Sequence, residues 1–427
     1  MKGDGQCNET AQPGPEEGPG SGTLPDEAGT RRLLMGAMLL QFAANGSVLP
    51  FVTMLLRDRG LVYEQVGWIY LAASTVMLVA PFGWGFLADR HLPLNRVLAI
   101  LNTAGAVALL VLVRQREFTG LLVAYVAFSA CLNPVFTLTN ALAFHHLPRP
   151  REQFPGLRAW GSVGWIVPFL PISLWTAFRP EAGLDFCVWM GAGMCLAMAI
   201  YSFRLPHTEP GSRRPAGGAG PRVYGPALRR LLRDWDYLAV LTSMFLMSGA
   251  FMMVLYYGPP FLERLGVSRP WIGPVQAVGV VFEVVLFRWQ SVLLRRFRLT
   301  SVILVGGLSL AVRHFLFAVS SNVWLLTATY LLVALVVVFH HTGIALLANA
   351  LAGREVRSTA QTLLAFCGFG LGPMFGNGVA TWLTRHYGDD LRPVFLAGGI
   401  MACMAMGVIA ARRRHLEVAG RRLDPPV

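Results

Sequence analysis

The sequence predicts an all-α membrane protein with twelve transmembrane helices in two six-helix bundles, and composition and segment length carry this prediction. Of the 427 residues, 54% are hydrophobic and only 14% are charged, whereas soluble domains carry about 25% charged residues. Twelve hydrophobic segments follow one another along the chain. Each is close to the ~20 residues that cross ~30 Å of hydrocarbon. We therefore expect a polytopic protein embedded in a lipid bilayer.

The chain divides into five parts around one long polar interruption. Residues 1–30 are rich in Gly, Pro, Glu and Ser, which predicts a disordered N-terminal tail. Residues 204–235 form a central loop, and the stretch PALRRLLRDWDYL at its end fits an amphipathic interfacial helix. The loop separates two bundles at 31–203 and 236–411, and a C-terminal tail follows at 412–427. The predicted spans are 33–56, 68–88, 97–113, 120–144, 157–178, 186–203, 236–257, 271–294, 300–319, 323–347, 358–383 and 392–411.

The basic residues indicate which side of the membrane holds the two termini. The side of the termini carries 26 of the 36 Lys and Arg residues, the opposite side carries 9, and Arg313 falls within a span. Since cytoplasmic loops are enriched in basic residues, we expect cytoplasmic termini. Topology thus accounts for the net charge of +13, and a nucleic-acid partner is not expected.

The residue pattern does not favour catalysis or a bound cofactor. Five of the six cysteines lie within hydrophobic segments and no CxxC pair occurs, so they are expected to be apolar packing residues. No Ser/His/Asp arrangement, metal spacing or phosphate loop is recognisable. We expect neither an enzyme nor a metal or cofactor site.

Glu283 lies deep inside the segment WIGPVQAVGVVFEVVLFRWQSVLL, farther from a segment end than any other acidic residue. A carboxylate at the centre of a membrane helix costs about 2.5–3.5 kcal/mol, so it usually faces a cavity, pairs with a cation or carries a proton. Arg313, His340 and His341 in the next two spans are the expected partners. Arg313 and Glu283 differ in depth by roughly 9 Å at 1.5 Å per residue. A moving contact in a proton cycle and a fixed structural pair are both open.

Polar side chains form helical stripes that could line one cavity. Gln41 and Asn45 share one face of the first span, and Gln276 shares a face with Glu283. Tyr256 and Tyr257 could supply a stacking surface for a solute ring. The alternative is hydrogen bonding between helices, worth about 0.6 kcal/mol on average. The other predicted solute-binding residues are Asn133, Thr137, Asn140 and Gln361.

The two halves echo each other. Gly60 and Gly67 follow the first helix of one half, and Gly266 and Gly273 follow the first helix of the other, with an offset of 206 residues. This pattern suggests parallel repeats, which place a binding site where the repeats meet. A separate glycine stripe in the eleventh span, at 368, 372 and 376, is expected to serve close helix packing.

The loop after the second span reads Gly85-Phe86-Leu87-Ala88-Asp89-Arg90 and resembles the signature loop of the major facilitator superfamily. The resemblance implies a close helix contact at Gly85 and a gate contact through Asp89 and Arg90. The following His91-Leu92-Pro93-Leu94 departs from the family, which usually has a glycine and basic residues there.

The fifth span begins LRAWGSVGW at residue 157, and together with Glu283 it resembles the branch of nucleoside–proton symporters and phenylpropionate permeases, relatives of lactose permease. FHHTG at 339–343 and STAQT at 358–362 add to the resemblance, which covers residues 33–411. That branch has an acid on helix ten, whereas this chain has Thr342-Gly343-Ile344-Ala345. Glu283 would therefore serve alone or with a histidine, or proton coupling is absent.

The resemblance implies a secondary transporter that works by alternating access as a monomer in the inner membrane. Its expected partners are protons and a small-molecule substrate, with nucleosides first, an aromatic acid second and a sugar or oligosaccharide third. The rival from another class is a membrane sensor or scaffold that kept the fold without transporting.

Overall fold

The computed structural model describes residues 27–148, 150–208, 229–352 and 356–420, and every regular element in these ranges is a helix. Twelve helical spans are long and apolar enough to cross a membrane, which confirms the predicted number. Of the predicted loop helix at 226–238, residues 226–228 lie outside the described residues, residues 229–231 are helical, and residues from Trp235 onward belong to the next long helix. Helix α1 begins at Glu27, so the last four residues of the expected disordered tail are helical.

The first half consists of six spans, two of which are broken. The breaks lie at residues 49–51 and 167–168, next to Pro50 and Pro168, where the helix loses a backbone donor. The helices are α1 (Glu27–Val48), α2 (Val52–Asp58), α3 (Tyr63–Arg90), α4 (Leu94–Arg114), α5 (Phe118–His146), α6 (Pro150–Ile166), α7 (Phe169–Phe178), η1 (Pro180–Ala182) and α8 (Asp185–Ser202).

The second half also consists of six spans and ends in an additional short helix. The helices are α10 (Trp235–Arg264), α11 (Arg269–Arg296), α12 (Leu299–Val319), α13 (Val323–Ala328), α14 (Tyr330–Leu335), η2 (Val336–His341), α15 (Thr342–Leu351), α16 (Arg357–Phe366), η3 (Cys367–Leu371), α17 (Gly372–Tyr387), α18 (Arg392–Ala411) and α19 (Arg413–Gly420). The turns η2 and η3 are π-helical, a distortion that is often found at functional sites. Helix α19 occupies the region expected to be a C-terminal tail.

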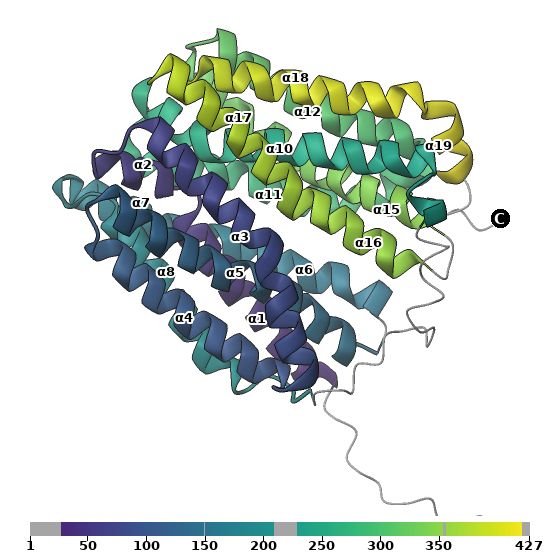
Figure 1. The fold of residues 1–427 in the computed structure, drawn as a ribbon, viewed down its shortest axis with the longest axis horizontal. Coiled ribbons are helices and arrows are strands. Elements are labelled where there is room, and N and C mark those ends of the chain that lie inside the picture. Colours follow the sequence, from purple (N-terminus) through teal and green to yellow (C-terminus); the bar gives the residue numbers. More distant parts are fainter. Residues whose placement is uncertain (1–26, 149, 209–228, 353–355, 421–427) are drawn as a thin grey trace, which may run out of the picture.

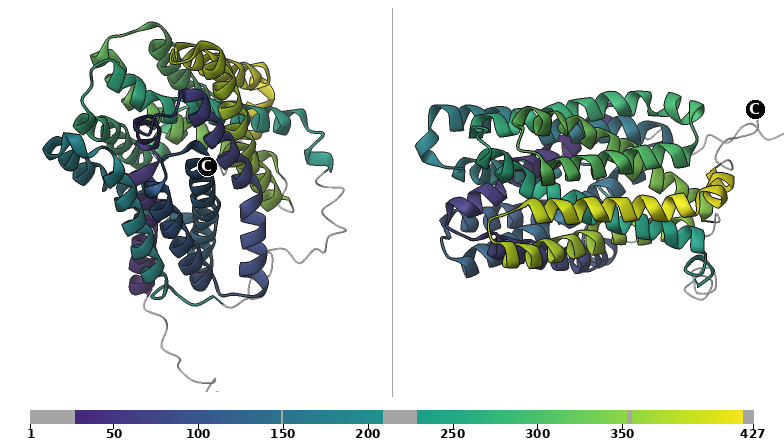
Figure 2. Two further views of the ribbon diagram at one scale, coloured as in Figure 1. Left: turned by 60° about the vertical axis from the view of Figure 1, so that its left-hand side comes forward. Right: turned by 90° about the horizontal axis from the view of Figure 1, so that it is seen from above.

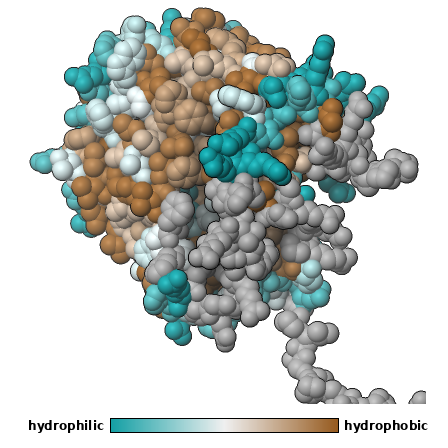
Figure 3. Space-filling view, turned by 45° about the vertical axis from the view of Figure 1, so that its right-hand side comes forward, coloured by the Kyte–Doolittle hydropathy of each residue, from teal (hydrophilic) through white to brown (hydrophobic). Residues whose placement is uncertain are grey.

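The two halves form two groups of helices, with α1 to α8 on one side and α10 to α18 on the other (Figure 1). The helices run lengthwise through the molecule when it is seen from above (Figure 2). We call the end that holds the start of α1 and helix α19 the terminal end, and the opposite end, with the α2–α3 and α10–α11 turns, the distal end. Space-filling atoms show a broad hydrophobic area with hydrophilic residues mostly along its margins (Figure 3), as expected for a surface in contact with lipid.

The buried apolar residues show where the halves are joined. One continuous core near the distal end contains residues of both halves, such as Phe51 and Phe261. Toward the terminal end the core splits in two. One cluster around Leu98 and Leu142 belongs to the first half, and another around Ile303 and Leu347 belongs to the second. The halves are therefore packed together at the distal end and have separate cores at the terminal end.

The glycines of the predicted repeat occupy equivalent places. Gly60 and Gly266 have φ angles of 85° and 100°, the left-handed region that glycine favours. Each ends its helix with the same pair of hydrogen bonds, in which the glycine and the next residue donate to carbonyls three and five residues back. A Cβ on Gly67 would lie 2.5 Å from Thr381 Oγ1, and a Cβ on Gly273 would lie 3.1 Å from Phe169 Cβ. Both second glycines thus allow close approach between helices of opposite halves.

The glycine stripe of the eleventh span also packs as expected. A Cβ on Gly376 would lie 2.4 Å from the carbonyl oxygen of Gly249, and one on Gly368 would lie 2.4 Å from Met244 Cε. Helix α17 and the π-turn before it therefore lie against α10 with almost no side-chain volume between them.

Candidate functional site

Glu283 lies in the middle of α11 and contacts the other half of the molecule. Its side chain is buried, with 8% exposure. Ser162 on α6 donates a hydrogen bond of 3.0 Å from its Oγ to Glu283 Oε1. The residues are 121 positions apart, so the bond forms only where the two halves meet. The buried acid thus has a polar partner across that boundary, as intramembrane carboxylates require.

Arg158 is the charged residue that acts on Glu283. It precedes Ser162 by one helical turn on α6, so both side chains lie on the same face. Its electrostatic interaction with Glu283 is favourable, and such attraction is strong where water is scarce. The guanidinium carbon lies 4.2 Å from the centroid of the Phe42 ring, a cation–π contact. The Nη1 atom of Arg158 is buried without a hydrogen-bond partner, so it retains capacity to bind a ligand or water.

Glycine and aromatic residues hold Arg158 in place. A Cβ on Gly161 would lie 2.8 Å both from Arg158 Nη1 and from Phe42 Cδ2. Phe42 in turn meets Phe136 of α5 edge to face, with ring centroids 4.7 Å apart. Helices α1, α5, α6 and α11 therefore bring an aromatic wall, a cation and an acid to one place.

Arg313 has its partners within its own half in this structure. This side chain, 1% exposed, donates a 3.1 Å hydrogen bond from Nη1 to the carbonyl of Thr329. Its guanidinium carbon lies 3.9 Å from the centroid of the Tyr330 ring. Both partners belong to its own half, and Arg313 forms no ion pair with Glu283 in this structure. The reason is position, because Arg313 lies near the distal end of α12 and finds its partners on the neighbouring α13–α14 segment.

His340 and His341 also have partners within their own half. His340 is buried, and its Nε2 lies 3.0 Å from the Oγ of Ser243 on α10. The His341 ring meets Phe251 edge to face at 5.5 Å. His340 and His341 are the last two residues of the π-helical turn η2. Neither contacts Glu283, so the expected partnership of Glu283 with the histidines is not present in this structure.

The predicted amide stripes differ in what their side chains do. Gln41 is buried and both its amide atoms lack a hydrogen-bond partner, while Asn45 donates to the Gln41 carbonyl at 3.0 Å. Gln276 donates to Ile272 of its own helix at 3.3 Å, and Gln361 donates to Ala345 at 2.8 Å. Gln41 is therefore the stripe residue whose buried amide keeps both its donor and its acceptor unused.

The stripe on α5 is less coherent. Asn133 reaches the Met77 carbonyl of α3 at a long 3.5 Å. Asn140 is half-buried, whereas Thr137 is exposed on the helix surface. The three side chains therefore differ in burial, and Asn133 is the one with a hydrogen bond to a neighbouring helix.

The tyrosines expected to stack on a solute contact tyrosines of the first half in this structure. Tyr256 of α10 lies parallel to Tyr70 of α3, with centroids 4.0 Å apart. The Tyr70 hydroxyl lies 2.5 Å from Thr53 Oγ1. Tyr257 meets Tyr63 at 6.1 Å. In this structure the tyrosines close the space between the halves toward the distal end and leave no free Tyr256 ring face on the Tyr70 side.

The residues of the predicted gate lie at the terminal end of α3. Asp89 and Arg90 are in its last turn; the side-chain contacts of Asp89 lie outside the described part of the structure. Among described residues, no atom lies within 4 Å of a Cβ built on Gly85. The described residues therefore do not show the close helix contact expected at Gly85.

Twelve spans in two six-helix halves, with a buried polar site between them, define a multi-pass membrane protein of the major facilitator type. The chain belongs to the MFS_1-like family, which it matches over residues 32–391. The resemblance derived from the signature loop is thereby confirmed.

Several curated transporters are similar to the chain. "Putative nucleoside transporter YegT" of Escherichia coli K12 is 25% identical over 75% of this chain and 76% of its own length. "Maltose permease" of Geobacillus stearothermophilus is 24% identical over 89% and 94%, and "Probable 3-phenylpropionic acid transporter" of E. coli K12 is 28% identical over 66% and 73%. These relatives are transporters, and this protein is a transporter and not an enzyme.

The crystal structure of the nucleoside transporter NupG has the same fold. The two chains superpose with a TM-score of 0.76 at 18% identity, over 90% of this chain and 99% of that one. This likeness confirms the predicted fold class.

The site contains two residues that the sequence analysis did not select. Arg158 and Ser162 lie at the start of the predicted span 157–178, and Arg158 was counted with the basic residues on the side of the termini. Helix α6 in fact begins at Pro150, so Arg158 lies in its third turn. A usable signal was present, because Arg158 and Ser162 are spaced i, i+4 in an otherwise apolar segment.

Proposed function

We propose that the protein is a secondary transporter that moves a small polar solute, nucleoside-like in the first instance, across the inner membrane by alternating access. We further propose that Glu283 couples this movement to protons. The observation that carries the proposal is the Ser162–Glu283 hydrogen bond, with Arg158 beside it. A buried acid whose partners belong to the other half must change its surroundings whenever the halves move relative to each other.

The chemistry of coupling follows from that arrangement. When Glu283 faces Arg158 and Ser162, a cation and a hydrogen-bond donor offset part of the cost of burying its negative charge. When the halves separate there, the carboxylate loses both, and protonation removes the cost of a lone charge in an apolar setting. Glu283 would therefore carry a proton in one state and release it in the other, which couples proton movement to rocking of the halves.

The arrangement of the cores supports a state that is closed at the distal end. The shared core and the stacked tyrosines lie toward that end, whereas the terminal end has two separate cores. With cytoplasmic termini, as the basic residues favour, this is an inward-facing state. Residues around Arg158 would then be reached from the cytoplasm.

A nucleoside fits the groups that are available. Its base can stack on an aromatic side chain such as Phe42, and its hydroxyls and ring nitrogens suit the Gln41 amide and the Glu283 carboxylate. The name of the relative YegT agrees with this choice.

An aromatic acid is the second candidate, because Arg158 Nη1 has no hydrogen-bond partner and lies beside Phe42. A carboxylate on a ring would satisfy both, and one relative is named for 3-phenylpropionic acid. Thermal-shift measurements with adenosine, uridine, 3-phenylpropionate and maltose distinguish the candidates, since only a ligand of the folded state raises its melting temperature.

Uptake of labelled uridine or adenosine into liposomes tests the proposal. We expect uptake by the wild-type protein that rises with an inward proton gradient and falls when an ionophore collapses the gradient. Glu283→Gln should lose this dependence, while Glu181→Gln, an exposed residue of η1, should keep it. Gradient-driven uptake by Glu283→Gln at the wild-type rate would refute the coupling role. Lack of any nucleoside uptake by the wild-type protein would refute the substrate class.

A further inference from the structure

We propose that six charged side chains at the distal end form a latch that holds the two halves together there, and that this latch opens when the solute site turns to the distal side. This inference rests on the alternating access of the proposed function. The distal latch consists of Arg57, Asp58, Glu263, Arg264, Arg269 and Asp389.

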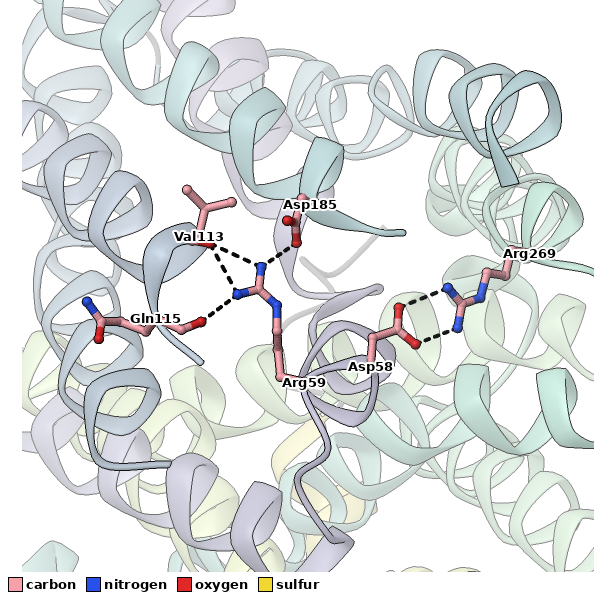
Figure 4. A network of polar contacts seen from close by, with 6 residues as sticks. All are labelled: Asp58, Arg59, Val113, Gln115, Asp185 and Arg269. Atoms are coloured by element: carbon pink, nitrogen blue, oxygen red, sulfur yellow. Dashed lines mark hydrogen bonds and ion pairs between the residues drawn. The ribbon is translucent and has the colours of Figure 1, made fainter. Parts of the chain in front are cut away.

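Arg269, the first residue of α11, bridges acids of both halves. Its Nη2 lies 2.6 Å from Asp58 Oδ1 and its Nη1 lies 2.8 Å from Asp58 Oδ2, a two-pronged contact with the end of α2 (Figure 4). Its Nε donates to Glu263 Oε1 at 2.5 Å. Two-pronged arginine–carboxylate pairs have a fixed geometry and are among the stronger polar contacts. One cation therefore ties the first half to the second.

Asp389, in the turn between α17 and α18, makes the reverse arrangement. Arg57 of the first half reaches Asp389 Oδ1 at 3.2 Å, and Arg264 of the second half donates to the Asp389 backbone carbonyl. Arg57 also lies over the Tyr63 ring, with its guanidinium carbon 4.3 Å from the centroid. Here one acidic residue receives cations from both halves. A further pair, Arg385 with Glu64, crosses the boundary nearby at 3.8 Å.

The internal repeat shows that opposite charges occupy equivalent positions. With the offset of 206 that relates Gly60 to Gly266, Arg57 corresponds to Glu263 and Asp58 corresponds to Arg264. The backbone turns at these positions have the same hydrogen bonds. The two distal ends therefore carry charges of opposite sign at equivalent positions.

The exposure of these side chains suits contacts that form and break. Arg269 and Asp58 are 30% and 27% exposed, and Asp389 is 58% exposed. Water can solvate each group when a pair separates, so this partial exposure lowers the cost of breaking each contact. Arg59, the neighbour of Asp58, is only 2% exposed and binds Asp185 and the Val113 and Gln115 carbonyls within the first half (Figure 4). Arg59 thus binds groups within the first half, whereas its neighbour Asp58 binds Arg269 of the second half.

Distances across the distal end test the latch without reference to any substrate. Spin labels at Ala182→Cys and Val319→Cys, in a background without native cysteines, report the separation of the two distal ends. We expect the wild-type protein to show mainly a short distance. Asp58→Arg, which sets a cation against Arg269, should shift the ratio of short to long distances by about five-fold or more, the factor that corresponds to roughly 1 kcal/mol.

The second cluster supplies a rescue. Asp389→Arg should shift the distances in the same direction, and Arg57→Asp combined with Asp389→Arg should restore the short distance. Arg298→Glu, which breaks an exposed ion pair with Glu417 at the terminal end, is the control and should change nothing. Asp58→Asn serves as the milder variant if Asp58→Arg does not fold.

Two outcomes separate failure of the latch from failure of the transport proposal. Unchanged distances in Asp58→Arg, or in Asp58→Asn, together with unchanged distances in Asp389→Arg, would overturn the latch whatever the protein transports. Distances that respond as expected, in a protein that takes up no nucleoside, would leave the latch standing and refute the substrate.

Discussion

Glu283 and Arg313 are both buried charged residues of the second half, but their hydrogen-bond partners lie in different halves of the molecule. Glu283 receives its hydrogen bond from Ser162 of the first half. Arg313 donates to Thr329 and packs on Tyr330, both in its own half. A charge held within one rigid half keeps its surroundings when the halves move, whereas a charge shared between the halves does not. Isolation in an apolar segment therefore marks a charge as unusual, and the location of its partner indicates what it does.

The largest predicted effect comes from removing the cation that faces Glu283. Arg158→Gln removes the cation whose attraction offsets part of the cost of burying the Glu283 carboxylate, and an uncompensated buried charge costs about 3 kcal/mol or more. Solute uptake should fall more than about a hundred-fold, because each 1.4 kcal/mol is about ten-fold. Wild-type uptake in liposomes by Arg158→Gln would contradict a role for Arg158 in holding the charge of Glu283.

Arg313→Leu should mainly affect stability. It removes a hydrogen bond to a buried carbonyl and a cation–π contact, which together are worth about 1–3 kcal/mol. We expect a lower melting temperature in detergent and uptake per folded molecule within about two-fold of wild type. A normal melting temperature combined with lost uptake in Arg313→Leu would show that Arg313 takes part in transport, as proposed for Glu283.

Two serines provide a matched comparison of smaller effect. Ser162 donates to Glu283 across the halves, whereas Ser243 lies 3.0 Å from His340 within the second half. Ser162→Ala should reduce uptake by about ten-fold or more, since a hydrogen bond to a charged group is worth about 1.5–3 kcal/mol and each 1.4 kcal/mol is about ten-fold. Ser243→Ala should lower only the melting temperature. Equal effects of the two changes on uptake would mean that crossing the boundary between halves has no special role.

The smallest effect concerns an exposed pair at the terminal end. A hydrogen bond from Arg413 lowers the pKa of Glu417 on α19. Because the carboxyl is more acidic in the folded state, its contribution to stability is present above its unfolded pKa of about 4.3 and is lost as the pH falls through the lower folded value. The difference in melting temperature between wild type and Glu417→Gln should therefore be small at pH 7 and vanish in acid. A difference that grows in acid would contradict this sign.

Much of the fold could be predicted because its signals are local. Segment lengths gave the twelve spans, and the repeat of Gly60 and Gly67 at Gly266 and Gly273 predicted equivalent turns and helix contacts that the structure contains. The site was predicted less well. Glu283 was selected correctly as a buried acid, but its predicted partners Arg313 and His340 lie elsewhere. Tyr256, expected to face a solute, faces Tyr70.

By itself, the sequence determined that this protein spans a membrane twelve times, that its halves are repeats, and that one acid lies deep within a span. These properties depend on hydropathy, helical period and glycine conformation, which act over a few residues. Only the tertiary structure decided that Glu283 meets Ser162 and Arg158 and that Arg269 joins acids of both halves. Pairing of polar residues depends on which helix faces lie together after the two bundles have packed. Ser162 and Glu283 are 121 positions apart and Asp58 and Arg269 are 211 apart, so the sequence around each residue does not indicate its partner.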